Sequence, residues 1–129
     1  MRYSDFWLDP YRLLCFVESE VFRNAWKKCG LTDNDLSDLQ AAILAQPKIG
    51  AVIQGTGGVR KMRFSPSGKS QGKSGAFRVL YCFFEEYGLV LLVTVYSKSQ
   101  TDDISPAGKK AMRKAIEAQD ELLKRGLKR

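Results

Sequence analysis

The sequence predicts a single α+β domain in which helices pack against a twisted, mainly antiparallel sheet. Apolar residues recur at helical spacing in three segments and form short apolar or alternating runs in four others, as is typical of helices and strands. The expected order is strand, helix, helix, three antiparallel strands, helix (β-α-α-β-β-β-α). With 129 residues, of which 44% are apolar and 27% charged, the chain has the composition of one globular domain over residues 1–129, including an N-terminal extension over residues 1–10.

Local signals set the expected boundaries of the first two helices. Ser19 is a typical N-cap residue and Gly30 a typical helix stop. The second helix is expected to begin at Thr32 or Asp33 and to end before Pro47. The expected elements are a strand over 11–17, helices over 20–29 and 32–46, a loop over 48–58, strands over 59–64, 76–84 and 89–96, and a helix that opens at Ser105-Pro106.

The strand over 59–64 alternates between apolar and basic residues. Met62 and Phe64 point to one face, so Lys61 and Arg63 share the other. If this strand pairs with the next one as a hairpin, Arg78 lies roughly opposite Arg63. We therefore expect these cations to gather on one face of the sheet.

Positive charge is concentrated in the second half of the chain. Residues 1–58 carry six Lys/Arg and seven Asp/Glu, whereas residues 59–129 carry fifteen and seven. This asymmetry favours a polyanionic partner, and a solvated basic face is the alternative. From position 60 to 78 no residue is acidic and six are basic, namely Arg60, Lys61, Arg63, Lys69, Lys73 and Arg78.

Several classes of site are excluded by composition. The chain has no histidine and three cysteines without C-x-x-C spacing, which excludes a Ser-His-Asp triad and the common zinc sites. The thiols are expected to be buried and reduced, as in a cytoplasmic protein. Two Gly-Lys-Ser triplets lack the earlier glycine of a P-loop. The longest apolar run, residues 89–95, is far shorter than the roughly 20 residues of a membrane span, and no membrane partner is expected.

Without histidine, proton transfer must use Lys, Arg, Tyr, Asp or Glu. Lys61 is a candidate base, because neighbouring cations favour the uncharged amine, which could take a proton from a ribose 2′-hydroxyl. Arg63 and Arg78 could stabilise a pentacovalent phosphate. Charge pattern alone leaves open whether the cluster does chemistry or only grips phosphate. Tyr81 and Tyr96 could stack on bases or donate a proton, or simply pack in the core.

The chain resembles the RelE/HigB family of toxins, in the branch whose pattern is Gly-Thr-Gly-Gly-x-Arg-Lys, Gly-Lys-x-Gly-Gly-x-Arg and Tyr-x-Lys. These motifs correspond to Gly55 to Lys61, Gly72 to Arg78 and Tyr96-Ser97-Lys98. The resemblance covers about residues 11–105. It implies the compact microbial RNase-like fold of RelE and a cytoplasmic toxin that cleaves messenger RNA in the ribosomal A site. It also implies a helix-turn-helix antitoxin of the HigA kind as partner, and no metal or cofactor.

By this resemblance Lys61 and Arg63 match the two basic positions before the loop, and Arg78 matches the arginine that holds the scissile phosphate. The family pattern has a further arginine after the last strand and a C-terminal tyrosine, near which this chain has serines. Tyr96 and Lys98 are therefore candidates to replace them, and the acid and base roles stay open. A gyrase inhibitor of the ParE kind and an RNA-binding protein without nuclease activity are the alternatives. The residues expected to contact RNA or the ribosome are Arg60, Lys69, Lys73 and Tyr81.

Overall fold

The structure is a computed structural model that describes residues 14–66, 76–97 and 104–127. Within these residues one five-stranded sheet has the order β1-β5-β4-β3-β2. β1 is parallel to β5 and the other neighbours are antiparallel, so the predicted α+β class is confirmed. The strands are β1 (Cys15–Glu18), β2 (Ala51–Val52), β3 (Val59–Phe64), β4 (Phe77–Phe84) and β5 (Leu89–Ser97).

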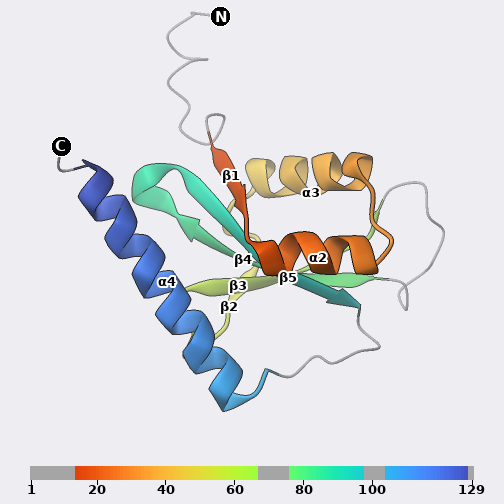
Figure 1. Ribbon diagram of the computed structural model, residues 1–129. Coiled ribbons are helices and arrows are strands. Elements are labelled where there is room, and N and C mark those ends of the chain that lie inside the picture. The colour runs from red at the N-terminus through yellow and green to blue at the C-terminus, as the bar shows by residue number, and fades with distance from the viewer. Residues whose placement is uncertain (1–13, 67–75, 98–103, 128–129) are drawn as a thin grey trace, which may run out of the picture.

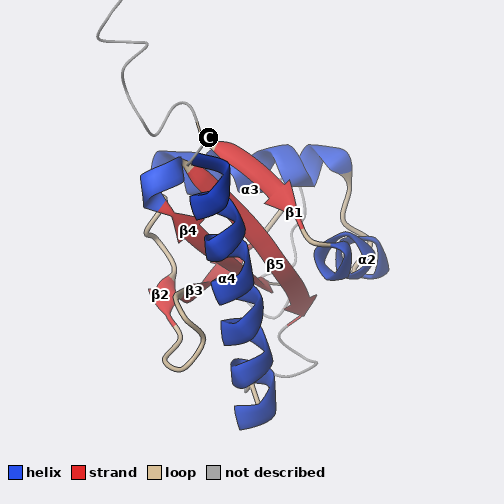
Figure 2. Ribbon diagram, turned by 60° about the vertical axis from the view of Figure 1, so that its left-hand side comes forward, coloured by secondary structure: helices blue, strands red, loops and turns tan. Residues whose placement is uncertain are grey.

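Helices cover both faces of this sheet (Figure 1). α2 (Glu20–Lys28) and α3 (Asp33–Ala45) lie on one face, and Figure 2 shows α4 (Pro106–Leu127) crossing the other. A short 3₁₀ turn, η3 (Glu85–Tyr87), joins β4 to β5. In the parts of the chain that the structure describes, no helix has both the length and the apolar composition that crossing a bilayer requires.

The first two helices begin where the sequence predicts, α2 after the Ser19 cap and α3 at Asp33. The Ser19 hydroxyl accepts a hydrogen bond from the Phe22 amide at 3.0 Å and donates one to the Val93 carbonyl at 2.8 Å, which ties the start of α2 to β5. Thr32 and Asp35 form a reciprocal capping box at α3. The strand predicted over 11–17 is observed as Cys15–Glu18, and residues 11–13 lie outside the described residues.

One strand was not predicted. The loop expected over 48–58 contains β2, which pairs with Arg60 and Lys61 of β3 at the edge of the sheet. Two residues are too few to produce an alternating pattern, so the sequence carries no periodic signal for this strand.

The sheet separates two apolar cores. The first lies under α2 and α3, and the second lies under α4. The buried members of the first are Phe22, Trp26, Leu31, Leu39, Ile43, Met62, Phe64, Val79, Tyr81, Val90, Leu92 and Val95. Those of the second are Val59, Leu80, Cys82, Phe84 and Ile116.

The three thiols differ in their surroundings, which corrects the expectation that all are buried. Cys15 is exposed on edge strand β1, whereas Cys82 is buried under α4. Burial raises the pKa of the Cys82 thiol to about 11 and also raises that of Cys29.

Candidate active site

The two faces of β3 have opposite chemistry. Met62 and Phe64 are 7% and 6% exposed and belong to the core under α2 and α3. Lys61 is partly exposed and Arg63 exposed, on the face that Val59 shares with α4. The predicted alternation is therefore confirmed, and it places both cations beside the segment of the sheet that α4 covers.

Three candidate residues form one row across the sheet. Arg63 of β3 is the register partner of Arg78 of β4, and Arg78 is the partner of Tyr96 of β5. Directly opposed side chains on one face have their Cβ atoms about 4.5–5.5 Å apart. The expectation that Arg78 lies opposite Arg63 is confirmed, and the register adds Tyr96 to the same row.

Along this row the side chains become less exposed from β3 to the neighbouring strands β4 and β5. Arg63 is exposed, Arg78 is 8% exposed, and the Nη1 atom of Arg78 and the hydroxyl of Tyr96 are shielded from solvent. Two arginines directly opposite each other on neighbouring strands destabilise a sheet. An anion held between them would replace this repulsion by charge-assisted hydrogen bonds, and a partly dry setting strengthens those bonds.

Lys61 lies in the adjacent row of the same face. Its register partner is Leu80, which in turn pairs with Thr94. Residues two apart on a strand are about 6.6 Å apart along its axis, so the amine lies within one side-chain length of a ligand held at Arg63. Leu80 is 1% exposed and gives Lys61 an apolar neighbour across the strand pair.

Arg60 does not join this cluster. It shares a face with Met62 and Phe64, and its Nη1 atom donates to the Gly50 carbonyl at 2.7 Å and to the Lys48 carbonyl at 3.3 Å. The guanidinium therefore holds the loop before β2 on the opposite side of the sheet from Lys61. Period-two alternation already implied this separation, because neighbours in a strand point to opposite faces.

Tyr81 is likewise on the opposite face. The side chain is fully buried, its hydroxyl donates to the Pro47 carbonyl at 2.8 Å, and it accepts from the Gly50 amide at 3.0 Å. Burial raises the pKa of this phenol. A ring in this setting offers no surface on which a base could stack.

Arg60 and Tyr81 together brace the strand that carries Lys61. A Cβ atom at Gly50 would lie 3.0 Å from the Lys61 carbonyl oxygen and 3.1 Å from the Arg60 Cβ atom, so any larger residue would push the loop and β3 apart by a few tenths of an ångström. Sequence reasoning missed this brace. The single available signal was a glycine three residues after Pro47, which specifies no partner.

The remaining sequence-predicted cations, Lys69, Lys73 and Lys98, lie outside the described residues. In the ranges 14–66, 76–97 and 104–127, no group of three or more His, Cys, Asp or Glu side chains could hold a metal ion. The described part of the candidate active site therefore consists of Lys61, Arg63, Arg78 and Tyr96.

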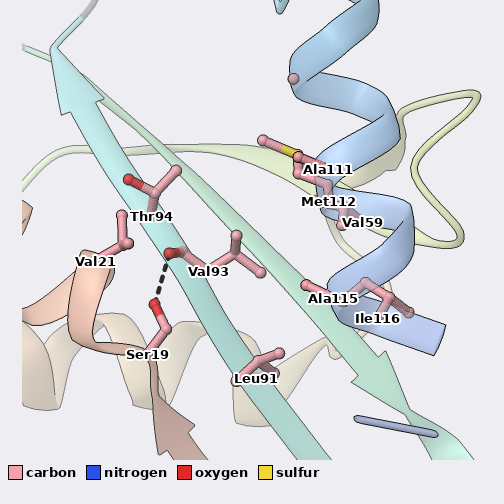
Figure 3. Close-up of a pocket in the computed structure, with 11 residues that line it drawn as sticks. Ser19, Val21, Val59, Leu91, Val93, Thr94, Ala111, Met112, Ala115 and Ile116 are labelled. Atoms are coloured by element: carbon pink, nitrogen blue, oxygen red, sulfur yellow. Dashed lines mark hydrogen bonds between the residues drawn. The ribbon is translucent and has the colours of Figure 1, made fainter. Parts of the chain in front are cut away.

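A separate apolar groove lies between the start of α2, β5 and α4 (Figure 3). It has a volume of about 370 Å³ and is lined by apolar side chains such as Val21, Val93 and Met112. Ser19 and Thr94 are its polar side chains, and the Ser19 hydroxyl is bonded to the Val93 carbonyl. Among the residues that the structure describes, no acid, base or cation lines this groove, so this lining offers no group for proton transfer.

No protein-family model matches the sequence. Among solved structures, the chain is similar to the free-state form of a double mutant of the E. coli toxin RelE, with 18% sequence identity and a TM-score of 0.46. The alignment covers 68% of this chain and 86% of the RelE chain.

Proposed function

We propose that this protein is the toxin of a type II toxin–antitoxin pair and acts as a ribosome-dependent, metal-independent endoribonuclease on messenger RNA. The observation that carries this proposal is the row Arg63, Arg78 and Tyr96 with Lys61 beside it on one face of the sheet. The positions that match the RelE/HigB pattern include every member of this set. The sheet register thus brings together residues that the sequence distributes over three strands.

The proposed reaction is attack of a ribose 2′-oxygen on the adjacent phosphorus. Lys61, as the uncharged amine, takes the 2′-hydroxyl proton while the O2′–P bond forms. The P–O5′ bond breaks, and the departing 5′-oxygen receives a proton from Tyr96 or Lys98. The products are a 2′,3′-cyclic phosphate, which water can open to a 3′-phosphate, and a 5′-hydroxyl end.

Arg63 and Arg78 would hold the non-bridging phosphate oxygens. Each guanidinium can donate two parallel hydrogen bonds, and the negative charge on these oxygens grows as the pentacovalent phosphate forms. Removing one such donor is expected to lower the cleavage rate by about 10² to 10³-fold. Arg78 is the better placed to act on the transition state, because it is 8% exposed and less screened by water than Arg63.

The partners follow from the same proposal. The ribosome would present messenger RNA in its A site, and a helix-turn-helix antitoxin of the HigA kind would neutralise the toxin in the cytoplasm. Because Tyr81 is buried, it offers no ring on which a base of the messenger RNA could stack. In this proposal the ribosomal decoding site, and not Tyr81, holds the messenger RNA in the geometry that cleavage requires.

Induced expression in bacteria tests the proposal. Growth should stop, and new 5′ ends should appear within translated transcripts but not in the same transcripts lacking a start codon. Arg78→Lys should abolish both effects, whereas Lys28→Arg, an exposed position on α2, should keep them. Growth arrest with intact messages would refute the nuclease and favour the gyrase-inhibitor alternative.

A further inference from the structure

The first half of α4 forms a second basic surface beside the glycine-rich turn that precedes β3. We propose that this surface, the α4 basic face, binds the phosphate backbone of RNA outside the cleaved dinucleotide. The choice of RNA as the polyanion rests on the proposed function. The α4 basic face consists of Lys109, Lys110, Arg113 and Lys114.

A rigid turn holds one edge of this surface. Thr56 is fully buried, its hydroxyl donates to the Ile53 carbonyl at 2.6 Å, and it accepts from the Val59 amide at 3.0 Å. Gly57 has φ +80, and a Cβ atom there would lie 3.3 Å from the Arg113 Cγ atom. The stem of Arg113 therefore packs on bare backbone. Its position is fixed by the fold, while the side chain stays exposed.

Lys109 repeats this arrangement one helical turn earlier. A Cβ atom at Gly55 would lie 3.8 Å from the Lys109 Cδ atom. Successive helix residues are rotated by about 100° about the helix axis. Lys110 and Lys114 therefore lie next to Lys109 and Arg113 around the helix, on the side away from the turn. The four side chains thus form one continuous arc from the turn to the outer side of α4.

This arc destabilises the helix that carries it. Lys109 and Arg113, and Lys110 and Lys114, are like charges four residues apart, and each pair costs about 0.2–0.5 kcal/mol. The first turn of α4 contains no acidic residue, so nothing there offsets cations near the positive end of the helix dipole. If this surface only faced water, acidic residues at these positions would make the helix more stable. The cations become favourable when they bind an anionic partner.

The charges are also available to a partner. Within the described residues, neither of the surface ion pairs, Lys48 with Glu85 and Lys124 with Asp120, involves the α4 basic face. Lys110, Arg113 and Lys114 are exposed. In the second half of α4, by contrast, Lys124 forms an ion pair with Asp120 at 3.2 Å.

The chemistry of this surface fits a nucleic-acid backbone better than a protein. Protein interfaces have an apolar centre that fills with large side chains. In the first half of α4, Met112 and Ile116 pack against the core under this helix, and the arc itself carries only cations. Backbone phosphates need no apolar anchor, and affinity then comes from counterion release.

The test measures binding of the full chain to a fluorescein-labelled RNA duplex by anisotropy over a range of salt concentrations. Lys110→Gln/Lys114→Gln should reduce the slope of log affinity against log salt by about 2, one for each phosphate that the variant no longer neutralises. The matched control is Lys27→Gln/Lys28→Gln. It removes two exposed lysines from α2, on the other side of the sheet, and should leave the slope unchanged.

Equal slopes for both double variants would overturn the inference, since total charge alone would then govern binding. It would also be overturned if Lys110→Gln/Lys114→Gln left RNA binding intact and abolished binding of poly-glutamate, which would identify an acidic protein surface. The proposed nuclease function is judged separately. Duplex binding involves no reaction, so absence of messenger-RNA cleavage would refute that function and leave this result standing.

Discussion

Arg60 and Tyr81 support the candidate active site from the far side of the sheet. Both bind the loop that precedes β2, through the Gly50 carbonyl and the Gly50 amide respectively. The same glycine lies against the backbone of Lys61. At the scale of single residues, the position of the proposed base thus depends on hydrogen bonds made on the opposite face.

Tyr81→Phe tests this brace. The substitution removes a donor to the Pro47 carbonyl and an acceptor for the Gly50 amide, and both are buried. We expect the free energy of unfolding to fall by about 1–3 kcal/mol, because buried polar groups lose their partners. Urea denaturation measures this loss. Tyr87→Phe, at a partly exposed ring, is the control and should change stability by less than about 0.5 kcal/mol.

Titration of the Cys82 thiol should make the folded protein less stable at alkaline pH. Burial raises the pKa of this thiol from 9.0 to about 11, with a smaller raising effect from Asp120, while Arg60 lowers it. The unfolded chain therefore releases this proton at lower pH than the folded chain. The stability that Cys82 contributes is fully present below pH 9 and is lost as the pH rises towards 11.

Thermal unfolding measured between pH 8 and 11 checks the Cys82 prediction. Cys82→Ala should lower stability at pH 8, because it leaves a small cavity, and should flatten the decline from pH 9 to 11. Burial also raises the pKa of Tyr81, so part of the decline above pH 10 should remain in this variant. Cys15→Ala, at the exposed thiol, serves as the control. An unchanged decline in Cys82→Ala would show that this thiol does not titrate as described.

At the scale of elements, the turn between β2 and β3 decides how α4 sits on the sheet. Gly55, Gly57 and Gly58 all have positive φ, and the first two contact α4 side chains. The sequence predicted only a loop over residues 48–58 in this region. It could not predict the partner, because α4 begins almost fifty residues later and its contact with the turn is a tertiary feature.

Gly57→Ala should therefore lower the free energy of unfolding by about 1–3 kcal/mol, since a residue with a Cβ atom is strained at this φ and meets Arg113. Gly126→Ala is a matched control in α4 itself. A Cβ atom there meets nothing within 4 Å, and alanine should be neutral or stabilising by up to about 1 kcal/mol. Chemical denaturation of both variants gives the comparison, and equal effects would show that the turn does not need glycine.

At the scale of the whole molecule, the two faces of the sheet differ in what they carry. One face packs on α2 and α3, and the other carries α4 and the row formed by Arg63, Arg78 and Tyr96. Alternation within β3 was enough to predict that Lys61 and Arg63 share a face. The inclusion of Tyr96 required the register of β4 and β5, which no local pattern specifies.

The order of elements was predictable for a related reason. The Ser19 cap, the helix start at Thr32 or Asp33 and the alternating and apolar runs at 59–64 and 76–84 are local signals that tertiary structure did not override. By contrast, charge and ring chemistry predict RNA contacts for Arg60 and Tyr81, whereas the structure shows both side chains bonded to the 47–50 loop. Their hydrogen bonds to the 47–50 loop join residues at least ten positions apart in the chain, which the sequence pattern does not relate to one another.

The most direct test of the central claim compares cleavage with binding in Lys61→Arg. Ribosomes programmed with a messenger RNA are mixed with excess protein, and single-turnover cleavage and ribosome affinity are measured separately. Arginine keeps the charge but cannot serve as a base at neutral pH, so the cleavage rate should fall by about 10² to 10⁴-fold while the affinity stays within about twofold. Lys28→Arg should change neither quantity. Cleavage at the normal rate by Lys61→Arg, or an equal loss of cleavage and affinity, would contradict the account.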